Sequence, residues 1–353
     1  MRPGNVVVDL GSGTGILGLM SLRAGAARVY SIESEGIIGL ARRIARANGV
    51  QDRMVFLHGI STRISLPEKV DVVLADHTGR FGFETGLLRD YSDARGRFLK
   101  PGGKLIPSAV TFWLAPVEHP EQWSQVEFWR SKPAGFDFGP ARELAANTGY
   151  PLRLEPQHLL APPQAALTLD LYQADAAGFE MTARFTIARA GVLHGIGGWC
   201  TARLSPSVEL TTSPLAADRI ARRNVFFPAE QAVALSAGDE VRTRVHVMPE
   251  EFVVTWRAEV WSGGKHGERK ASFTHSTFQG MFMPEEGLAR TKPDFVPRMN
   301  KWGEARVSLL RLCDGRRRLS EIEDEIFRLH PDLFRTRQEA ASFVAEVVTR
   351  YSL

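Results

Sequence analysis

The stretch "VVVDLGSGTGILGLMSLRAGAARVYSIE", residues 6–33, decides the fold of this 353-residue chain. Asn5 to Leu10 are largely apolar and β-branched without alternation, which predicts a parallel strand buried on both faces. A glycine-rich loop at 11–15 follows, and Ile16 to Arg23 has the apolar spacing of a helix. A second strand is expected over Arg28 to Ile32. The stretch therefore predicts a strand–loop–helix–strand unit.

The same alternation continues downstream of this unit. A helix is expected over residues 36–47, and strands are expected over residues 54–57, 70–74 and 104–106. Strands that alternate with helices form parallel sheets with right-handed crossovers. We therefore predict a Rossmann-like, doubly wound α/β domain.

The glycine loop carries the first chemical signal. Gly11, Gly13 and Gly15 would let the backbone approach a ligand closely, next to the free N–H groups of a helix N-terminus. Glu33 ends the next strand, where an acidic side chain can bind a ribose diol. A dinucleotide fold would place its third glycine at position 16, which is Ile16 here. The spacing thus favours a nucleoside cofactor other than a dinucleotide, although a purely structural turn is the alternative.

Composition excludes several classes of protein. Two cysteines, Cys200 and Cys313, rule out a disulfide scaffold, and nine scattered histidines show no metal-ligand spacing. No apolar run reaches the ~20 residues that a membrane span requires, and no secretion leader opens the chain. The formal net charge of +4 is too mild to indicate nucleic-acid binding. We therefore expect a cytoplasmic protein without a metal.

The second half of the chain changes pattern. Residues 179–185, 241–247 and 252–256 alternate apolar and polar side chains, which predicts antiparallel strands with one solvated face. Beyond a linker at 291–297, apolar residues recur at helical spacing over 305–312, 319–329 and 337–350, with Ser320 as the expected helix cap. A β domain followed by a small helical domain is predicted.

The loop and its surroundings resemble class I S-adenosylmethionine-dependent methyltransferases, and in particular the protein arginine methyltransferase family. The resemblance rests on three stretches, which are the opening one, "LPEKVDVVLADHTGRFGFETGLL" (66–88) and "ARGRFLKPGGKLIPSAVTFWLAPVE" (94–118). It implies a Rossmann-like domain over 1–107, a β-barrel substrate domain over 108–290, and homodimers formed through an arm near 123–149. It also implies S-adenosyl-L-methionine as cofactor. The implied cofactor-binding residues are Asp9, Gly11, Gly13, Gly15 and Glu33.

Two carboxylates are the natural device for orienting a guanidinium nucleophile through paired hydrogen bonds. By resemblance, Asp76 and Glu84 would be this catalytic pair, in the loop that the family calls double-E. Asp76 is one methylene shorter than the family's glutamate, and the loop is one residue shorter. Arg80 could pair with one of the carboxylates. Solvated loop acids without a role are the alternative.

Three further departures from the family affect the expected site. The family's Thr-His-Trp loop falls on Arg219-Ile220-Ala221, where Arg219, Arg222 and Arg223 form a basic cluster. Such a cluster disfavours a cationic arginine substrate and better suits an acidic peptide or a different nucleophile; a solvated basic loop is the alternative. No acid follows the third strand, so Ser61 or Thr62 is expected at the adenine. The family's N-terminal helices have no counterpart before the first strand, so we expect the true start to lie upstream.

Residues 301–353, with "LLRLCDGRRRLSEIEDEIF", resemble the small PqqD family, which binds leader peptides. A helical cap that only packs against the barrel is the alternative. The function expected from the whole sequence is methyl transfer to a nitrogen of a peptide or protein side chain, with the C-terminal domain recruiting the peptide. The rival is a catalytically silent scaffold that binds the cofactor or recruits partners.

Overall fold

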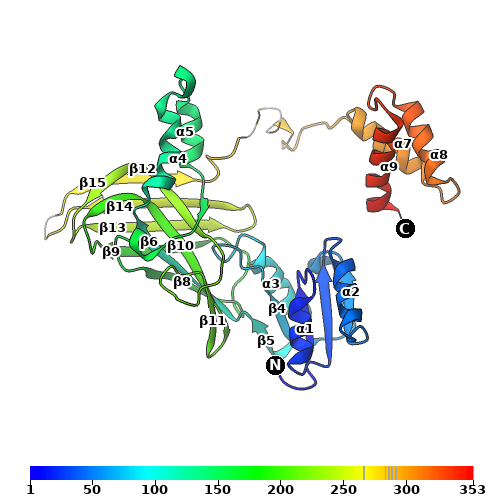
Figure 1. Ribbon diagram of the computed structural model, residues 1–353, viewed down its shortest axis with the longest axis horizontal. Helices are drawn as coiled ribbons and strands as arrows, with labels where there is room; N and C mark the ends of the chain where they lie inside the picture. Colours follow the sequence, from blue (N-terminus) through cyan, green and yellow to red (C-terminus); the bar gives the residue numbers. More distant parts are fainter. Residues whose placement is uncertain (265–266, 283, 285–286, 288, 291, 353) are drawn as a thin grey trace. The chain divides into compact units, whose positions relative to one another are not determined.

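The computed structural model describes residues 1–353 except 265–266, 283, 285–286, 288, 291 and 353 (Figure 1). The chain divides into two compact units, Met1–Phe282 and Met283–Leu353. Each is described by itself below.

The first unit begins with a five-stranded parallel sheet in the order β3-β2-β1-β4-β5. Its strands are β1 (Val6–Leu10), β2 (Arg28–Glu33), β3 (Met54–His58), β4 (Val70–Ala75) and β5 (Leu99–Ile106). Its helices are α1 (Ile16–Arg23), α2 (Ile38–Ala47) and α3 (Leu87–Arg97). The predicted Rossmann-like domain is confirmed, and the expected elements differ from the observed ones mainly by a few residues at their ends.

The apolar residues Val6 to Val8 of β1 are explained by two cores, one on each side of the sheet. Val7 joins a cluster with Leu22 of α1 and Ala45 of α2. Its neighbour Val8 faces the other way, into a cluster that includes Leu88 of α3. Both valines are fully buried. Because successive side chains of a strand point to opposite faces, a strand covered on both faces favours apolar residues at successive positions, and the buried Asp9 is the exception in β1.

Ten further strands form two antiparallel sheets. One sheet has the order β7-β12-β10-β6-β8, with β11 paired to β10, and the other has the order β15-β14-β13-β9. The strands are β6 (Ala109–Val117), β7 (Tyr150–Leu152), β8 (Gln164–Asp170), β9 (Phe179–Thr186), β10 (Gly191–Ser205), β11 (Val208–Thr211), β12 (Asn224–Leu235), β13 (Glu240–Met248), β14 (Val253–Trp261) and β15 (Arg269–Ser276). Residues from both sheets share one core, with Phe112 from one and Phe185 and Val245 from the other. The period-2 pattern thus predicted the buried and exposed faces of β9, β13 and β14 in the four-stranded sheet.

A helical arm interrupts the β domain between β6 and β7. It contains α4 (Pro120–Glu127), two short 3₁₀ turns and α5 (Gly139–Ala146), and it projects from the strands in Figure 1. Arg142 of α5 is nearly buried and anchors the arm: Glu127 of α4 accepts from its guanidinium at 2.9 Å. The same guanidinium donates to the carbonyl oxygen of Glu230 in β12 at 2.5 Å. Charge-assisted hydrogen bonds of this kind hold the two helices and the sheet in register.

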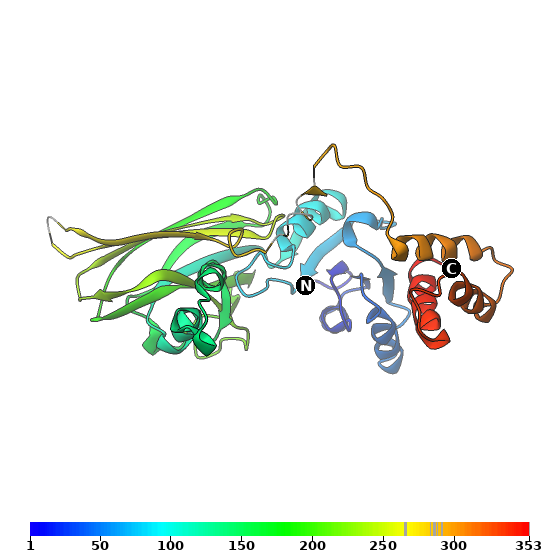
Figure 2. The same cartoon turned by 90° about the horizontal axis from the view of Figure 1, so that it is seen from above.

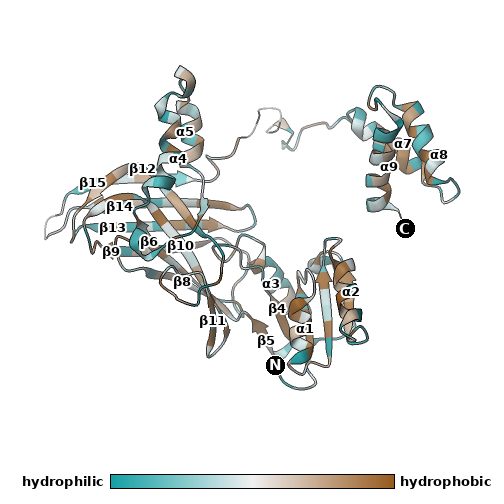
Figure 3. Ribbon diagram, viewed as in Figure 1, coloured by the Kyte–Doolittle hydropathy of each residue, from teal (hydrophilic) through white to brown (hydrophobic). Residues whose placement is uncertain are grey.

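The second unit is a helical bundle with its own core. Its helices are α7 (Lys301–Leu312), α8 (Leu319–Leu329) and α9 (Arg337–Tyr351), and brown, apolar residues recur along all three in Figure 3. Leu309, Ile326 and Val344 are fully buried where the helices meet. The prediction that Ser320 caps the second helix is wrong. Arg318 is the N-cap, and its backbone N–H donates to Glu321 Oε2 at 2.8 Å, which leaves Ser320 inside the helix.

The linker expected at 291–297 lies partly outside the described residues, because position 291 is not described. Among the helices that the structure describes, none has the length and apolarity needed to cross a membrane. The strands and the arm of the first unit can be followed from a second direction in Figure 2.

Candidate active site

A surface hollow of about 440 Å³ lies where the carboxyl ends of β1, β2, β3 and β4 meet. This edge is where ligands bind in open parallel sheets. Residues from several loops line it, among them Gly11, Ile32, Ser34, Ser61, His77 and Thr85. The hollow therefore brings the glycine loop, the end of β2 and the loop after β4 to one place.

The glycine loop adopts a backbone conformation that favours glycine. Gly11, Gly13 and Gly15 have φ values of 64°, 52° and 82°, in the left-handed region. Gly15 is also the N-cap of α1. A Cβ built on Gly13 would meet no heavy atom within 4 Å, so the loop presents open backbone on that side. This is the geometry expected of a loop that a ligand approaches closely.

Glu33 and the glycine loop are in direct contact. Glu33 Oε2 accepts from the backbone N–H of Gly13 at 2.8 Å, and Oε1 accepts from the N–H of Glu35 at 2.9 Å. A carboxylate has about four acceptor positions, so each oxygen keeps capacity for a further donor such as a hydroxyl. The two sequence signals that lie 20 residues apart thus form one structural unit.

Asp9 is completely buried beneath the same loop. Its Oδ2 accepts from the N–H of Gly18 at 3.1 Å, whereas Oδ1 and the hydroxyl of Ser12 are buried with no hydrogen-bond partner among the described residues. Burial raises the pKa of Asp9 to about 7; the Gly18 N–H opposes the rise, and the negative charges of Asp76 and Glu33 add to it. Buried polar atoms without partners are costly, so these two are candidates for satisfaction by a bound ligand.

Asp9→Asn is expected to make the folded protein more stable than the wild type at pH 8, with the advantage disappearing near pH 4. Because folding raises the Asp9 pKa from 3.8 to about 7, the stability contributed by its protonated form is full below about pH 4 and is lost as the pH rises through 7. Asparagine does not titrate. At about 1.4 kcal/mol per pKa unit, the advantage at pH 8 is at most about 4 kcal/mol. Urea unfolding at both pH values measures it, and an advantage independent of pH would contradict the assignment.

The expected catalytic carboxylates lie in the loop between β4 and α3, but they point into different surroundings. The side chain of Glu84 is 20% exposed and folds back onto its own loop, where Oε2 accepts from the N–H of Phe81 at 2.8 Å and from the N–H of Arg80. The guanidinium Nε of Arg80 donates to Oε1 at 3.0 Å, as the sequence suggested. Asp76 is far more open, with 55% of its side chain exposed.

Asp76 is paired with an arginine that the sequence did not associate with it. Arg222, between β11 and β12, donates from Nη2 to Asp76 Oδ1 at 2.9 Å and to the Asp76 carbonyl oxygen at 3.0 Å. Its Nη1 donates to the hydroxyl of Thr78 at 2.7 Å. The two partners lie 146 residues apart, and nothing in local sequence could have signalled the contact.

The basic cluster at 219–223 is therefore mostly neutralised in the structure. Arg219 binds both carboxylate oxygens of Glu155, at 2.7 and 2.8 Å, and the carbonyl oxygen of Leu154. Arg222 is held by Asp76. Only Arg223 is exposed without a hydrogen-bond partner among the described residues. The expectation of an open basic loop is thus replaced by two specific ion pairs and one solvated arginine.

Of the two residues expected near the adenine, one lines the hollow and the other does not. Ser61 is buried and lines the hollow, whereas Thr62 is half-buried and does not line it. His77 was missed by the sequence reading. Its Nδ1 lies 3.3 Å from the position of a Cβ on Gly11, and its Nε2 lies 3.4 Å from Asp90 Oδ2 of α3. It packs the glycine loop against the loop after β4.

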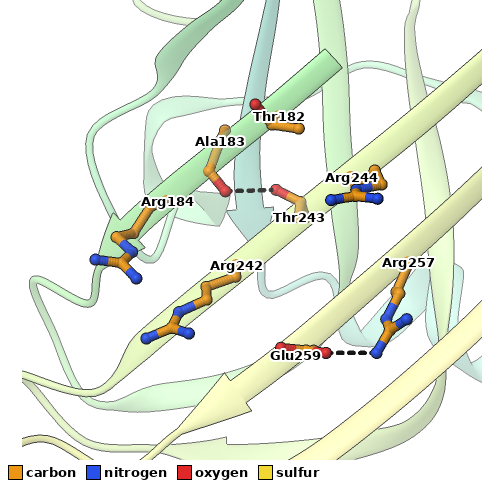
Figure 4. Close-up of a pocket in the computed structure, with 8 residues that line it drawn as sticks. All are labelled: Thr182, Ala183, Arg184, Arg242, Thr243, Arg244, Arg257 and Glu259. Atoms are coloured by element: carbon orange, nitrogen blue, oxygen red, sulfur yellow. Dashed lines mark hydrogen bonds and ion pairs between the residues drawn. The ribbon is translucent and has the colours of Figure 1, made fainter. Parts of the chain in front are cut away.

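A second hollow, of about 500 Å³, lies on the four-stranded sheet and shares no lining residue with the first (Figure 4). Arg184, Arg242, Arg244 and Arg257 extend over it, with Glu259 accepting from Arg257 at 2.6 Å. Carboxylates of neighbouring residues pair with the other three arginines. In the part of the chain that the structure describes, no group of three or more metal-ligating side chains occurs.

Comparisons with known proteins agree with this architecture. Residues 108–256 match the arginine methyltransferase oligomerization subdomain, and residues 1–110 match ribosomal protein L11 methyltransferase (PrmA). Probable protein arginine N-methyltransferase 6 of Arabidopsis thaliana is 37% identical over 42% of this chain and 34% of its own length. Protein arginine N-methyltransferase 1 of Chlamydomonas reinhardtii is 28% identical over 69% of this chain and 72% of its own length. The chain thus spans only about a third of the first of these relatives.

Solved structures show the same fold. Protein arginine methyltransferase 10 of Arabidopsis thaliana superposes with a TM-score of 0.68 at 23% identity, over 78% of this chain and 90% of that one. A chain of the Trypanosoma brucei PRMT1 enzyme–prozyme heterotetramer with AdoHcy gives 0.69 at 19% identity, over 78% and 89%. In sequence and in fold, this chain resembles the protein arginine methyltransferases.

Proposed function

We propose that the chain is an S-adenosyl-L-methionine-dependent methyltransferase of the protein arginine methyltransferase type, which transfers a methyl group to a side-chain nitrogen of a peptide or protein. The observation that carries the proposal is the contact of Glu33 with the N–H of Gly13 beside the hollow at the sheet edge. A solely structural turn does not require a charged side chain there. The sequence similarity to arginine methyltransferases supports the reaction class.

The cofactor would be held by Asp9, Gly11, Gly13, Gly15 and Glu33. The cofactor supplies an electrophilic methyl group on a sulfonium sulfur. The chain's own residues would bind and orient it: Glu33 has acceptor capacity for ribose hydroxyls, and the glycines let the backbone come close. The unpartnered Asp9 Oδ1 and Ser12 hydroxyl fit a polar ligand. Ser61, which lines the hollow, would contact the adenine, and Thr62 is the second candidate.

Asp76 and Glu84 would be the catalytic carboxylates. A nucleophilic nitrogen must approach the methyl carbon in line, and positioned carboxylates can orient a cationic acceptor and receive its proton. Glu84 already accepts two loop N–H groups and Arg80, so its place is well defined. Asp76 offers an exposed carboxylate at the end of β4.

We further propose that the chain forms homodimers through the helical arm. The arm carries exposed aromatic side chains, with Phe136 68% exposed and Phe128 50% exposed. Ile16 and Met20 of α1 are also exposed and line a hollow of about 390 Å³. Exposed apolar surfaces of this kind mark interaction sites. Sedimentation analysis at micromolar concentration should give a dimer that Phe136→Asp weakens, and a monomeric wild type would contradict the proposal.

The C-terminal bundle is proposed to bind peptide and recruit it to the first unit, as the resemblance of residues 301–353 to the PqqD family suggests. What supports the idea is that the bundle has its own core, separate from that of residues 1–282. Exposed Leu319, Leu329 and Trp302 offer apolar contacts for a peptide.

Calorimetry with S-adenosyl-L-methionine, followed by transfer of labelled methyl groups to arginine-containing peptides, tests the proposed function. Binding together with labelled peptide is the expected result. Cofactor binding without transfer to any peptide would favour the rival function, a silent scaffold. That rival is favoured by one observation, namely that arginines of the chain itself occupy both proposed catalytic carboxylates.

A further inference from the structure

Arg222 places its guanidinium on Asp76, one of the two proposed catalytic carboxylates. Three hydrogen bonds hold it, to Asp76 Oδ1, to the Asp76 carbonyl oxygen and to the hydroxyl of Thr78. All three acceptors belong to the loop that follows β4, whereas Arg222 comes from the β domain. The planar fork of a guanidinium suits such multiple, directed hydrogen bonds. Arg222 therefore recognises this loop as a specific site rather than as a diffuse patch of negative charge.

The other two arginines of the cluster, Arg219 and Arg223, do not contact Asp76. Arg219 binds Glu155 and Leu154, outside the proposed active site. Arg223, the next residue in the chain, is exposed. All three residues belong to the segment between β11 and β12, which has no helix or strand. One arginine of three is thus aimed at Asp76, and the Arg219–Glu155 pair holds the segment three residues before it.

We propose that Arg222 is the specificity-determining residue of the acceptor site: it is a resident guanidinium that competes with a cationic acceptor for Asp76. This inference rests on the proposed role of Asp76 in methyl transfer. A peptide arginine would present the same chemical group to the same carboxylate, and both cannot occupy it. While Arg222 is in place, Asp76 is neutralised, and the site disfavours a second guanidinium.

The contact is able to open. The Arg222 side chain is 31% exposed and that of Asp76 is 55% exposed, so water can take over their hydrogen bonds. Ion pairs with this exposure contribute little to stability because solvent screens them. Loss of the competitor is therefore expected to tighten the binding of a cationic acceptor by about two- to fivefold, not by orders of magnitude.

The test compares the full-length wild type with Arg222→Gln and with Arg223→Gln, which is the matched control because it removes the same charge from the adjacent exposed residue. Binding of a fluorescent Gly-Arg-Gly-Arg-Gly peptide is measured by anisotropy in the presence of S-adenosylhomocysteine, and a lysine version of the peptide is run alongside. Circular dichroism melting confirms that each variant is folded. The expected result is about two- to fivefold tighter binding of the arginine peptide to Arg222→Gln, with Arg223→Gln equal to the wild type or weaker.

Two results overturn the proposal. One is an Arg222→Gln protein that binds the arginine peptide no more tightly than the wild type, including the case in which neither binds. The other is equal tightening in both variants, which would reduce the effect to net charge. Because the readout is binding, it is independent of turnover. Tighter binding without labelled-methyl transfer would sustain the competition while contradicting the proposed function, and transfer by the wild type with unchanged binding would do the reverse.

Discussion

Replacing Glu33 with glutamine is expected to weaken the binding of S-adenosyl-L-methionine by roughly 10- to 100-fold. Glu33 accepts from the backbone N–H groups of Gly13 and Glu35, one on each carboxylate oxygen. Glutamine replaces one of these acceptors with an NH₂ donor, so one loop N–H loses its partner and the ribose loses a charged acceptor. The loop N–H that loses its partner does so in the free and in the bound protein alike, so this loss lowers stability rather than affinity. A hydrogen bond from the ribose to a charged acceptor is worth about 1.5–3 kcal/mol, and its loss accounts for the predicted change in Kd.

Isothermal calorimetry with wild type, Glu33→Gln and Glu35→Gln measures this effect. The side chain of Glu35 is exposed two residues away, so its substitution makes the same change in charge without touching the loop. A Kd for Glu33→Gln within threefold of the wild-type value would remove Glu33 from the cofactor site. A matching loss in Glu35→Gln would show that local charge alone is responsible.

Glu84→Gln is expected to lower the rate of methyl transfer by about 100-fold or more while leaving cofactor affinity unchanged. The Glu84 carboxylate receives two loop N–H groups and the Nε of Arg80. Loss of its charge removes an acceptor for the nucleophile, and it also loosens the loop that carries Asp76. Misplacement of a reacting group by about 1 Å is enough for a rate loss of this size.

The experiment measures kcat/KM for labelled-methyl transfer alongside the cofactor Kd. Glu68→Gln is the matched control, because Glu68 also pairs with an arginine, Arg28 at 3.2 Å, away from the hollow. Equal rates for wild type and Glu84→Gln would exclude Glu84 from the mechanism. A parallel loss of cofactor affinity would show that the loop supports the cofactor rather than the nucleophile.

Most of the cofactor half of the candidate site could be predicted because its signals are local. The order strand, glycine loop, helix, strand and acid brings Gly13 and Glu33 together whatever the rest of the chain does, since a right-handed crossover has few alternatives. The prediction of the α8 N-cap was wrong because two nearby residues offered local signals for the start of the helix. Both Arg318 and Ser320 can begin a helix, and only the reach of Glu321 back to the Arg318 N–H selects between them.

The acceptor half could not be predicted in the same way. Sequence alone placed Asp76 and Glu84 in one loop and three arginines in another. It suggested that Arg80 pairs with one of the two carboxylates without showing which one. It could not show that Arg222 binds Asp76 or that Arg219 binds Glu155. The sequence likewise gave no signal that His77 lies close to Gly11.

The amino-acid sequence by itself determined the parallel sheet, the antiparallel β domain, the helical bundle and the glycine–glutamate unit. These depend on hydrophobic periodicity and on backbone conformations that neighbouring residues impose. Only the tertiary structure decided which charges meet. An ion pair such as Arg222 with Asp76 joins residues 146 positions apart, and its partners are chosen by the packing of two domains. In the folded protein, Arg222 of the predicted basic cluster therefore binds Asp76, a proposed catalytic carboxylate.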